Sequence, residues 1–170
     1  MITKLCISLL CASVAAGTLA TSPEDIGTGT FHPITAADDS ATAAARRGFL
    51  EVSGWVFKAA ELVPADKYSY RPAPSVRTFG QLVAHVVDSY QYYCGRAAGK
   101  KLEWSDAVEK GALGKTTLVQ RLKQAGDACT PAYTQSAPIG VLFENVGHTS
   151  LHYGNMITYL RMMGLTPPSS

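Results

Sequence analysis

The sequence predicts an all-α protein built as a four-helix bundle. Apolar residues recur at spacings of three and four residues in four segments, which glycines and prolines separate from one another. No segment shows a convincing strand pattern of alternating apolar and polar residues. The chain has 170 residues, 46% hydrophobic and 16% charged, which suits one domain with a buried core and excludes wholesale disorder. Four helices in one small domain usually pack as a bundle.

Residues 1–20 have the three parts of a secretory signal peptide. The first residues carry one positive charge, residues 5–16 form an uncharged apolar run, and the small residues Thr18 and Ala20 suit the positions before a cleavage site. The run is well short of the ~20 residues that a membrane-spanning helix needs. We therefore expect cleavage near Ala20, export to the periplasm or the medium, and no stable membrane insertion. An internal helix and cleavage at a lipid-bearing Cys11 are the alternatives.

A leader and a proline-rich connector flank the first predicted helix. Residues 21–34 are rich in glycine and proline, so we expect a flexible leader in which His32 lies in a surface loop. The bundle domain is predicted over residues 35–168. Its first helix is expected over residues 35–63, and a rigid connector over residues 64–77 follows. The residues expected on the buried side of this helix are Leu50, Trp55 and Leu62.

The second helix has the clearest local signals. Thr78 is expected to cap it, residues 79–98 to form it, and Gly99 to end it. A loop is expected over residues 102–115. The apolar positions of the helix at three- and four-residue spacing are Phe79, Leu82, Val83, Val86 and Tyr90.

Two further helices complete the predicted bundle. Thr116 or Thr117 is expected to cap the third helix, and residues 139–163 are expected to form the last one, which Gly164 ends. The apolar stripe of the third helix is predicted to comprise Leu118, Leu122, Ala125 and Cys129. The stripe of the last helix is predicted to comprise Leu142, Val146, Leu151, Met156, Ile157 and Leu160.

The chain has four cysteines, of which two fall in the predicted signal peptide. Cleavage would remove Cys6 and Cys11, so the mature chain keeps Cys94 and Cys129. In an oxidising compartment two remaining thiols are candidates for one disulfide. Two buried, reduced cysteines acting as small hydrophobic residues are the alternative.

Three histidines are the candidate metal ligands. His148 and His152 lie four residues apart on the predicted last helix, so their Cβ atoms are ~5–6 Å apart on one face, within reach of one divalent ion. Thr149 follows the first of them, which excludes the zinc-protease pattern His-Glu-x-x-His. His85 lies in the second helix among valines and alanines, where an unpaired imidazole is costly to bury. Ordinary core or surface histidines are the alternative.

Three neutral imidazoles with an open coordination position would form a Lewis-acid or hydroxide-generating site. Zinc and nickel suit imidazole ligands, and iron is compatible with them. Two further residues are candidates for contacts around the ion. Asp88 either orients an imidazole or lies in solvent, and Asn155 either forms a hydrogen bond near the metal or fills a polar gap.

Four motifs resemble those of the DinB-like superfamily: PADKYSYRP at residues 64–72, RTFGQLVAH at residues 77–85, HTSLHYGN at residues 148–155 and YLRMMGLTPP at residues 159–168. The resemblance spans about residues 40–168. It implies a four-helix bundle in which His85, His148 and His152 converge on one divalent metal ion. It also implies a homodimer formed through helix faces.

The resemblance implies chemistry on small molecules. Characterised DinB-like proteins include enzymes that transfer or isomerise substrates with small cellular thiols, which a metal ion activates as thiolates. Export would separate this chain from those thiols, so hydrolysis is the competing reaction. We therefore expect a metal-dependent transferase or hydrolase, or alternatively a non-catalytic, stress-associated bundle that the ion closes. The net charge of +2 comes from scattered basic residues, which argues against a nucleic-acid partner.

Overall fold

The computed structural model describes residues 40–134 and 136–170, and within these residues it contains helices and no strand. The predicted signal peptide, the predicted leader and His32 lie outside the described residues. The predicted all-α bundle is confirmed. Its long helices are α1 (Ala41–Leu62), α2 (Phe79–Ala97), α4 (Lys115–Cys129) and α5 (Ile139–Met162), and its short elements are η2 (Ala65–Lys67), α3 (Ala107–Lys110) and η3 (Thr130–Ala132).

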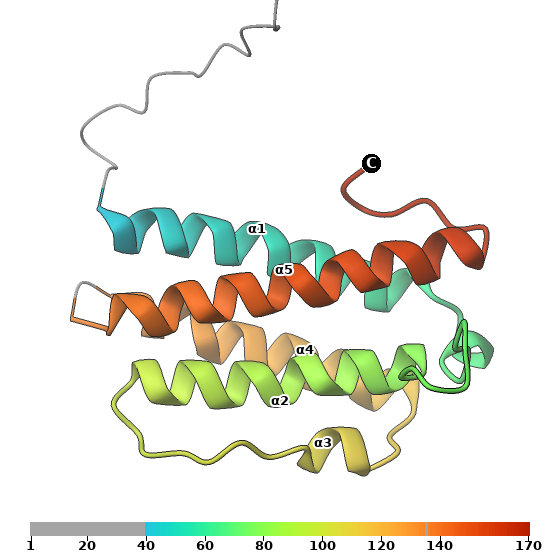
Figure 1. Cartoon of the computed structure of the whole chain (residues 1–170), viewed down its shortest axis with the longest axis horizontal. Coiled ribbons are helices and arrows are strands. Elements are labelled where there is room, and N and C mark those ends of the chain that lie inside the picture. The colour runs from blue at the N-terminus through green and yellow to red at the C-terminus, as the bar shows by residue number, and fades with distance from the viewer. Residues whose placement is uncertain (1–39, 135) are drawn as a thin grey trace, which may run out of the picture. The chain divides into compact units, whose positions relative to one another are not determined.

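The first and last long helices are parallel to each other and antiparallel to the two long helices between them. Figure 1 shows that α1 and α5 point one way, whereas α2 and α4 point the other way. Two consecutive parallel helices need a connection that returns along the bundle. Residues 98–114 form that connection and carry α3, which packs against α2. Part of the predicted loop is therefore a short helix lying beside the second long helix.

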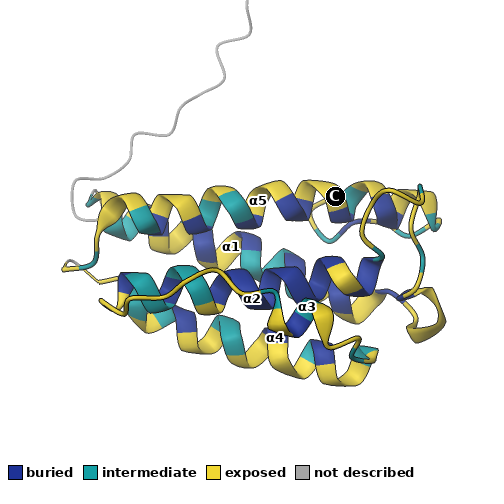
Figure 2. Cartoon of the chain, turned by 60° about the horizontal axis from the view of Figure 1, so that its bottom comes forward, coloured by how far each residue is buried: buried dark blue, intermediate teal, exposed yellow. Residues whose placement is uncertain are grey.

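The most deeply placed helix is α2, in which thirteen of nineteen residues are buried (Figure 2). Its start is a capping box, as the Thr78 side chain accepts a hydrogen bond from the Gln81 backbone at 3.1 Å and the Gln81 side chain accepts one from the Thr78 backbone at 2.9 Å. The predicted cap is confirmed. All five apolar residues expected in its core are buried: Phe79, Leu82, Val83, Val86 and Tyr90.

Three leucines expected in the core lie at the surface instead. Leu50 and Leu62 of α1 are 42% and 43% exposed, and Leu151 of α5 is 64% exposed. In α1 the reason is that the buried stripe lies beside the predicted one: Phe49 takes the core position next to Leu50, and Ala59 and Ala60 take those before Leu62. The buried stripe comprises Ala45, Phe49, Val52, Val56, Ala59 and Ala60.

The helix ends agree with the prediction at some positions and differ at others. The start of α4 is capped by Gly114, so Thr116 and Thr117 both lie in its first turn and the predicted cap is wrong. Two predicted stop residues, Gly99 and Gly164, have φ values of +81° and +75°, a conformation that glycine adopts without steric cost. Each follows the end of its helix as expected.

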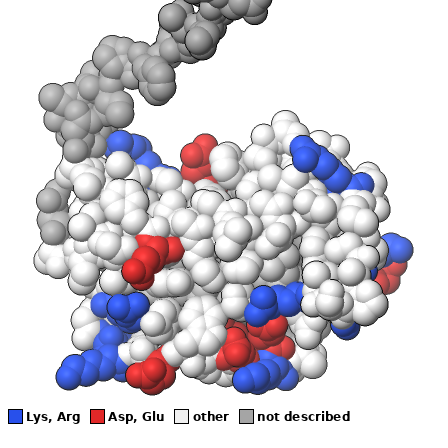
Figure 3. Space-filling view, in the orientation of Figure 1, with Lys and Arg blue, Asp and Glu red and all other residues white. Residues whose placement is uncertain are grey.

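Charged residues are mixed in sign over the visible surface. On the face shown in Figure 3, groups of Lys and Arg and groups of Asp and Glu are scattered over a largely uncharged surface. Among the described residues, no helix combines the length and the apolar character needed to cross a membrane.

Candidate metal centre

The fold brings three histidines from two helices together. His85 lies in the middle of α2, and His148 and His152 lie one turn apart on α5, which packs directly against α2. One ring nitrogen from each histidine lies within 4.8 Å of the other two. The ring centroids of His148 and His152 are 4.4 Å apart, and that of His85 is 4.6 Å from His152. His85 thus forms one cluster with two histidines that lie 63 and 67 residues further along the chain.

The spacing of the ring nitrogens fits a shared cation. The Nε2 atoms of His148 and His152 are 3.2 Å apart. Two nitrogens bound tetrahedrally to zinc at about 2.0–2.1 Å would lie about 3.3–3.4 Å apart. The other ring nitrogen of each residue, Nδ1, is buried without a hydrogen-bond partner in the described chain. The two Nε2 atoms are close enough to share one hydrogen bond, and their spacing equally fits a cation that accepts both Nε2 lone pairs.

Burial keeps the three imidazoles neutral, which is the form that binds metal. Burial is the main cause that lowers the pKa of His152 to about 3 and that of His148 to about 4. Burial also lowers the pKa of His85, against an opposing effect of Glu109. The nearby Arg77 guanidinium lowers the pKa of all three histidines further, because a positive charge disfavours protonation.

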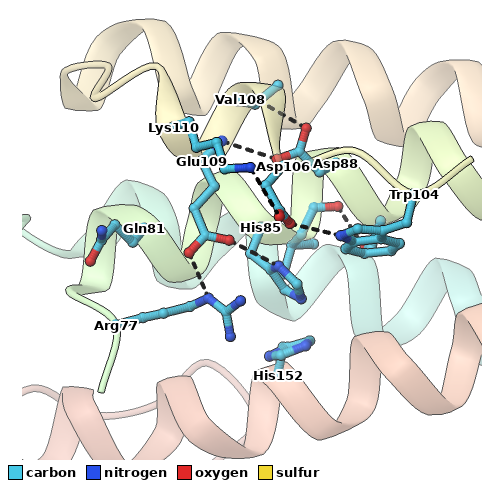
Figure 4. Close-up of polar contacts among 12 residues, drawn as sticks. Arg77, Gln81, His85, Asp88, Trp104, Asp106, Val108, Glu109, Lys110 and His152 are labelled. Atoms are coloured by element: carbon cyan, nitrogen blue, oxygen red, sulfur yellow. Dashed lines mark hydrogen bonds and ion pairs between the residues drawn. The ribbon is translucent and has the colours of Figure 1, made fainter. Parts of the chain in front are cut away.

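Glu109 of α3 is the residue that orients His85 (Figure 4). Its Oε2 atom lies 3.1 Å from Nδ1 of His85, and its Oε1 atom accepts a hydrogen bond of 2.7 Å from Nε of Arg77. A carboxylate only accepts hydrogen bonds, so Nδ1 of His85 carries the proton and Nε2 keeps a free lone pair. Carboxylates commonly orient metal-binding histidines in this way. Sequence reasoning missed Glu109, which lies 24 residues from His85.

Asp88 neither bonds to an imidazole nor lies in solvent, the two roles expected from the sequence. Its side chain is buried and accepts hydrogen bonds from the backbone of Val108 and of Glu109, both at 3.0 Å. The carboxylate therefore satisfies backbone N–H groups at the start of α3 that have no partner within the helix, and it fixes α3 on α2. It acts on the histidines only through the position of Glu109.

An aromatic wall, Trp104 and Tyr93, covers one side of the cluster. The Trp104 ring lies 5.2 Å from His85 and 5.8 Å from His148, and the Tyr93 ring lies 5.4 Å from His148. Trp104 is held by a hydrogen bond of 2.7 Å from its indole nitrogen to Asp106. His85, Asp106 and Glu109 form an alternative cluster. In this alternative both oxygens of Glu109 and one oxygen of Asp106 already accept hydrogen bonds, so the three histidines form the better ligand set.

The opposite side opens into a cleft of about 600 Å³. Of the three histidines, His152 alone lines this cleft, together with Arg77 and Glu109. Asn155 is exposed at the same cleft and forms no hydrogen bond with another described residue. Asn155 thus lies at the cleft beside His152, and the hydrogen bond expected between Asn155 and the surroundings of a metal stays a prediction.

Two of the four cysteines, Cys94 and Cys129, lie together in the structure. Cys94 near the end of α2 and Cys129 at the end of α4 are joined as a disulfide, with their Cα atoms 5.1 Å apart. Asn145 of α5 lies against this bond, with Nδ2 at 3.4 Å from each sulfur and at 2.9 Å from the Tyr133 hydroxyl oxygen. The disulfide and Asn145 thus connect α2, α4 and α5.

These features define an all-α bundle with a candidate three-histidine metal centre. The family model described as the DinB superfamily matches residues 56–156, more than half of the chain, and this range includes all three histidines. The protein therefore belongs to the DinB superfamily. A comparison with curated proteins finds no match.

Proposed function

We propose that this protein is a metal-dependent enzyme, a hydrolase or transferase that acts on a small molecule. One observation carries the proposal: three neutral histidines converge, and one of them lines an open cleft. Catalytic zinc sites keep one position free beside three protein ligands, whereas structural sites have four. The fourth side here is a cleft rather than another ligating side chain.

Each residue around the centre has a defined task. His85, His148 and His152 would hold the ion, for which zinc and nickel are the best candidates and iron the next. When bound, the ion supplies Lewis-acid chemistry, as it stabilises negative charge on a ligand oxygen or sulfur and lowers the pKa of that ligand. Glu109 fixes the orientation of His85, and the Trp104 ring packs against His85 from the other side of the cluster.

Hydrolysis is our first choice of reaction because we also propose export. Residues 1–20 have the pattern of a signal peptide, and an exported enzyme would be separated from the cellular thiol pool. Mass spectrometry of the exported product tests this step. A mature chain that begins near Thr21 is expected, and a retained residue 1 in the exported fraction would contradict it.

The function is tested by comparing metal-loaded protein, chelated protein and the His148→Ala variant. We expect turnover of at least one substrate in a panel of esters, amides, phosphoesters and thiol-transfer substrates, and its loss in the other two samples. Lys58→Ala, an exposed change on α1 away from the histidines, is the control. Equal turnover after chelation would contradict metal dependence.

Chelation also separates the enzyme from its alternative, a non-catalytic bundle closed by the ion. The ligands join α2 to α5, so an ion there would tie two helices together. We expect circular dichroism to show the same helix content with and without metal, because α2 and α5 already share an apolar core. Loss of helix on chelation would favour the structural role.

We further propose that the protein forms a homodimer through α5. This helix exposes apolar residues along one face, with small glycines between them: Ile139, Phe143, Gly147, Leu151, Gly154 and Met162. Nothing lies within 4 Å of a side chain added at either glycine, which leaves room for a second helix. We expect light scattering to give a dimer mass for the native chain and a monomer mass for Leu151→Glu. A native monomer would contradict the proposal.

A further inference from the structure

The cleft beside the histidines is lined by one cationic side chain, Arg77, whose terminal nitrogens form no hydrogen bond with a described residue. Arg77 uses Nε to bind Glu109, and no described residue forms a hydrogen bond with its Nη1 or Nη2 atoms. Its side chain is 42% exposed, and both Arg77 and His152 line the cleft. Figure 4 shows the guanidinium group on the same side of the cluster as His152.

Arg77 is held in this place by its neighbours. The Tyr159 hydroxyl donates a hydrogen bond of 2.7 Å to the Arg77 carbonyl, and Thr78, the next residue, is fixed by the capping box of α2. Glu109 holds the guanidinium itself at 2.7 Å. The positively charged group is therefore oriented before any ligand arrives, and such preorganisation lowers the entropy lost on binding.

The charges in the cleft do not balance once the histidines hold an ion. Glu109 cancels the charge of Arg77, and both of its oxygens are already engaged. A divalent ion on three neutral histidines would then leave two unbalanced positive charges beside a guanidinium group. Positive charges brought this close in a partly buried site favour an anionic ligand between them.

We propose that the cleft binds a small carboxylate whose anionic group lies between the three-histidine centre and the Nη atoms of Arg77. The cleft volume of about 600 Å³ suits a small molecule. Its polar rim is formed by Ser75, Asn155 and Thr158, and its apolar lining includes Val76 and Leu82. The ligand therefore combines a carboxylate with a small apolar body and a group that can form hydrogen bonds. This subsite deepens the proposed function and depends on the same metal centre.

Binding can be measured without any reaction, with cobalt(II)-loaded protein and benzoate as the probe. Visible absorption of the cobalt ion reports a ligand that enters its coordination sphere, and elemental analysis confirms loading. We expect benzoate to change the spectrum saturably and neutral benzamide to have no effect. In Arg77→Gln the dissociation constant for benzoate should rise by at least about tenfold, the loss expected for a charged hydrogen bond. Arg161→Gln, a change of an exposed arginine on α5, should bind as the native chain does.

A second variant guards against an indirect effect of losing Arg77. Thr158→Trp keeps the arginine and fills the cleft, and it should also weaken benzoate binding while cobalt loading stays complete. Equal affinity for benzoate in the native, Arg77→Gln and Thr158→Trp chains, or equal affinity for benzoate and benzamide, would overturn the carboxylate subsite and leave the metal-dependent function standing. A chain that takes up no cobalt would overturn both.

Discussion

The two halves of the bundle, α1 with α4 and α2 with α5, differ in the side chains that they bury; we call the first the apolar half. The buried side chains of α1 and α4 are apolar except for the sulfur of Cys129. In contrast, α2 and α5 carry every buried polar residue of the described chain: His85, Asp88, Ser89, Asn145, Thr149 and His152. Buried polar groups without partners are costly, so any unsatisfied group on these two facing helices points to a candidate site.

We call these six buried polar residues of α2 and α5 the polar seam. Their hydrogen bonds separate residues with a structural role from the candidate metal ligands. Ser89 and Thr149 donate to carbonyls of their own helices at 2.8 and 2.7 Å, and Asp88 fixes α3. The histidine cluster keeps buried nitrogens without partners on two of its members, His148 and His152. Ser89, Thr149 and Asp88 are thus satisfied within the described chain, whereas His148 and His152 are not. Asn145 keeps its Oδ1 atom without a partner as well, and His85 is satisfied by Glu109.

The largest change in stability is expected in the apolar half. Phe49 of α1 is 1% exposed and its ring stacks on Tyr133 at 4.8 Å. Phe49→Ala should lower the free energy of unfolding by about 3–5 kcal/mol, measured by chemical denaturation, because it leaves a cavity. Metal content per folded molecule should stay unchanged. A loss of metal from the folded variant would show that metal binding by α2 and α5 depends on the packing of the apolar half.

The disulfide is expected to contribute the next largest effect. Cys94 and Cys129 are separated by 35 residues and join α2 to α4. Replacing both by alanine should lower the free energy of unfolding by about 2–4 kcal/mol, since the unfolded chain gains freedom. A reductant should destabilise the native chain and leave the double variant unaffected. Equal stability of native and variant chains under oxidising conditions would contradict the bond's role.

Glu109 tests whether the polar seam is organised for metal binding. Glu109→Ala removes the acceptor that orients His85, so the metal dissociation constant should rise about 10–100-fold. Glu144→Ala is the matched control, because that carboxylate is 57% exposed on α5 and lies 3.7 Å from Arg96. Calorimetric titration with zinc provides the measurement. Unchanged zinc affinity in Glu109→Ala would contradict a role of Glu109 in metal binding.

His152 should show the smallest effect on stability, and with the opposite sign. His152→Leu replaces a buried imidazole whose Nδ1 lacks a partner, so the metal-free protein should gain about 1 kcal/mol of unfolding free energy. The same change should abolish the stabilisation that added zinc gives the native chain. A clear loss of stability in the metal-free variant would mean that the histidine serves the fold instead.

The sequence predicted features with strong local signals and missed those set by tertiary contacts. Thr78 and Phe79 begin α2 as expected, because a capping box depends on residues that are close in the chain. Leu151 was misplaced because helical spacing alone does not tell a core stripe from an exposed apolar one. Glu109 was missed because its role depends on a four-residue helix that Asp88 holds against α2.

The metal content of the purified mature chain tests the central claim most directly. The protein should be prepared without a histidine tag and analysed for metals beside His85→Ala, a variant in the α2 half of the site. We expect close to one divalent ion per native chain and a clear loss in the variant. A folded native chain that holds no metal and refuses added zinc and nickel would contradict the three-histidine centre.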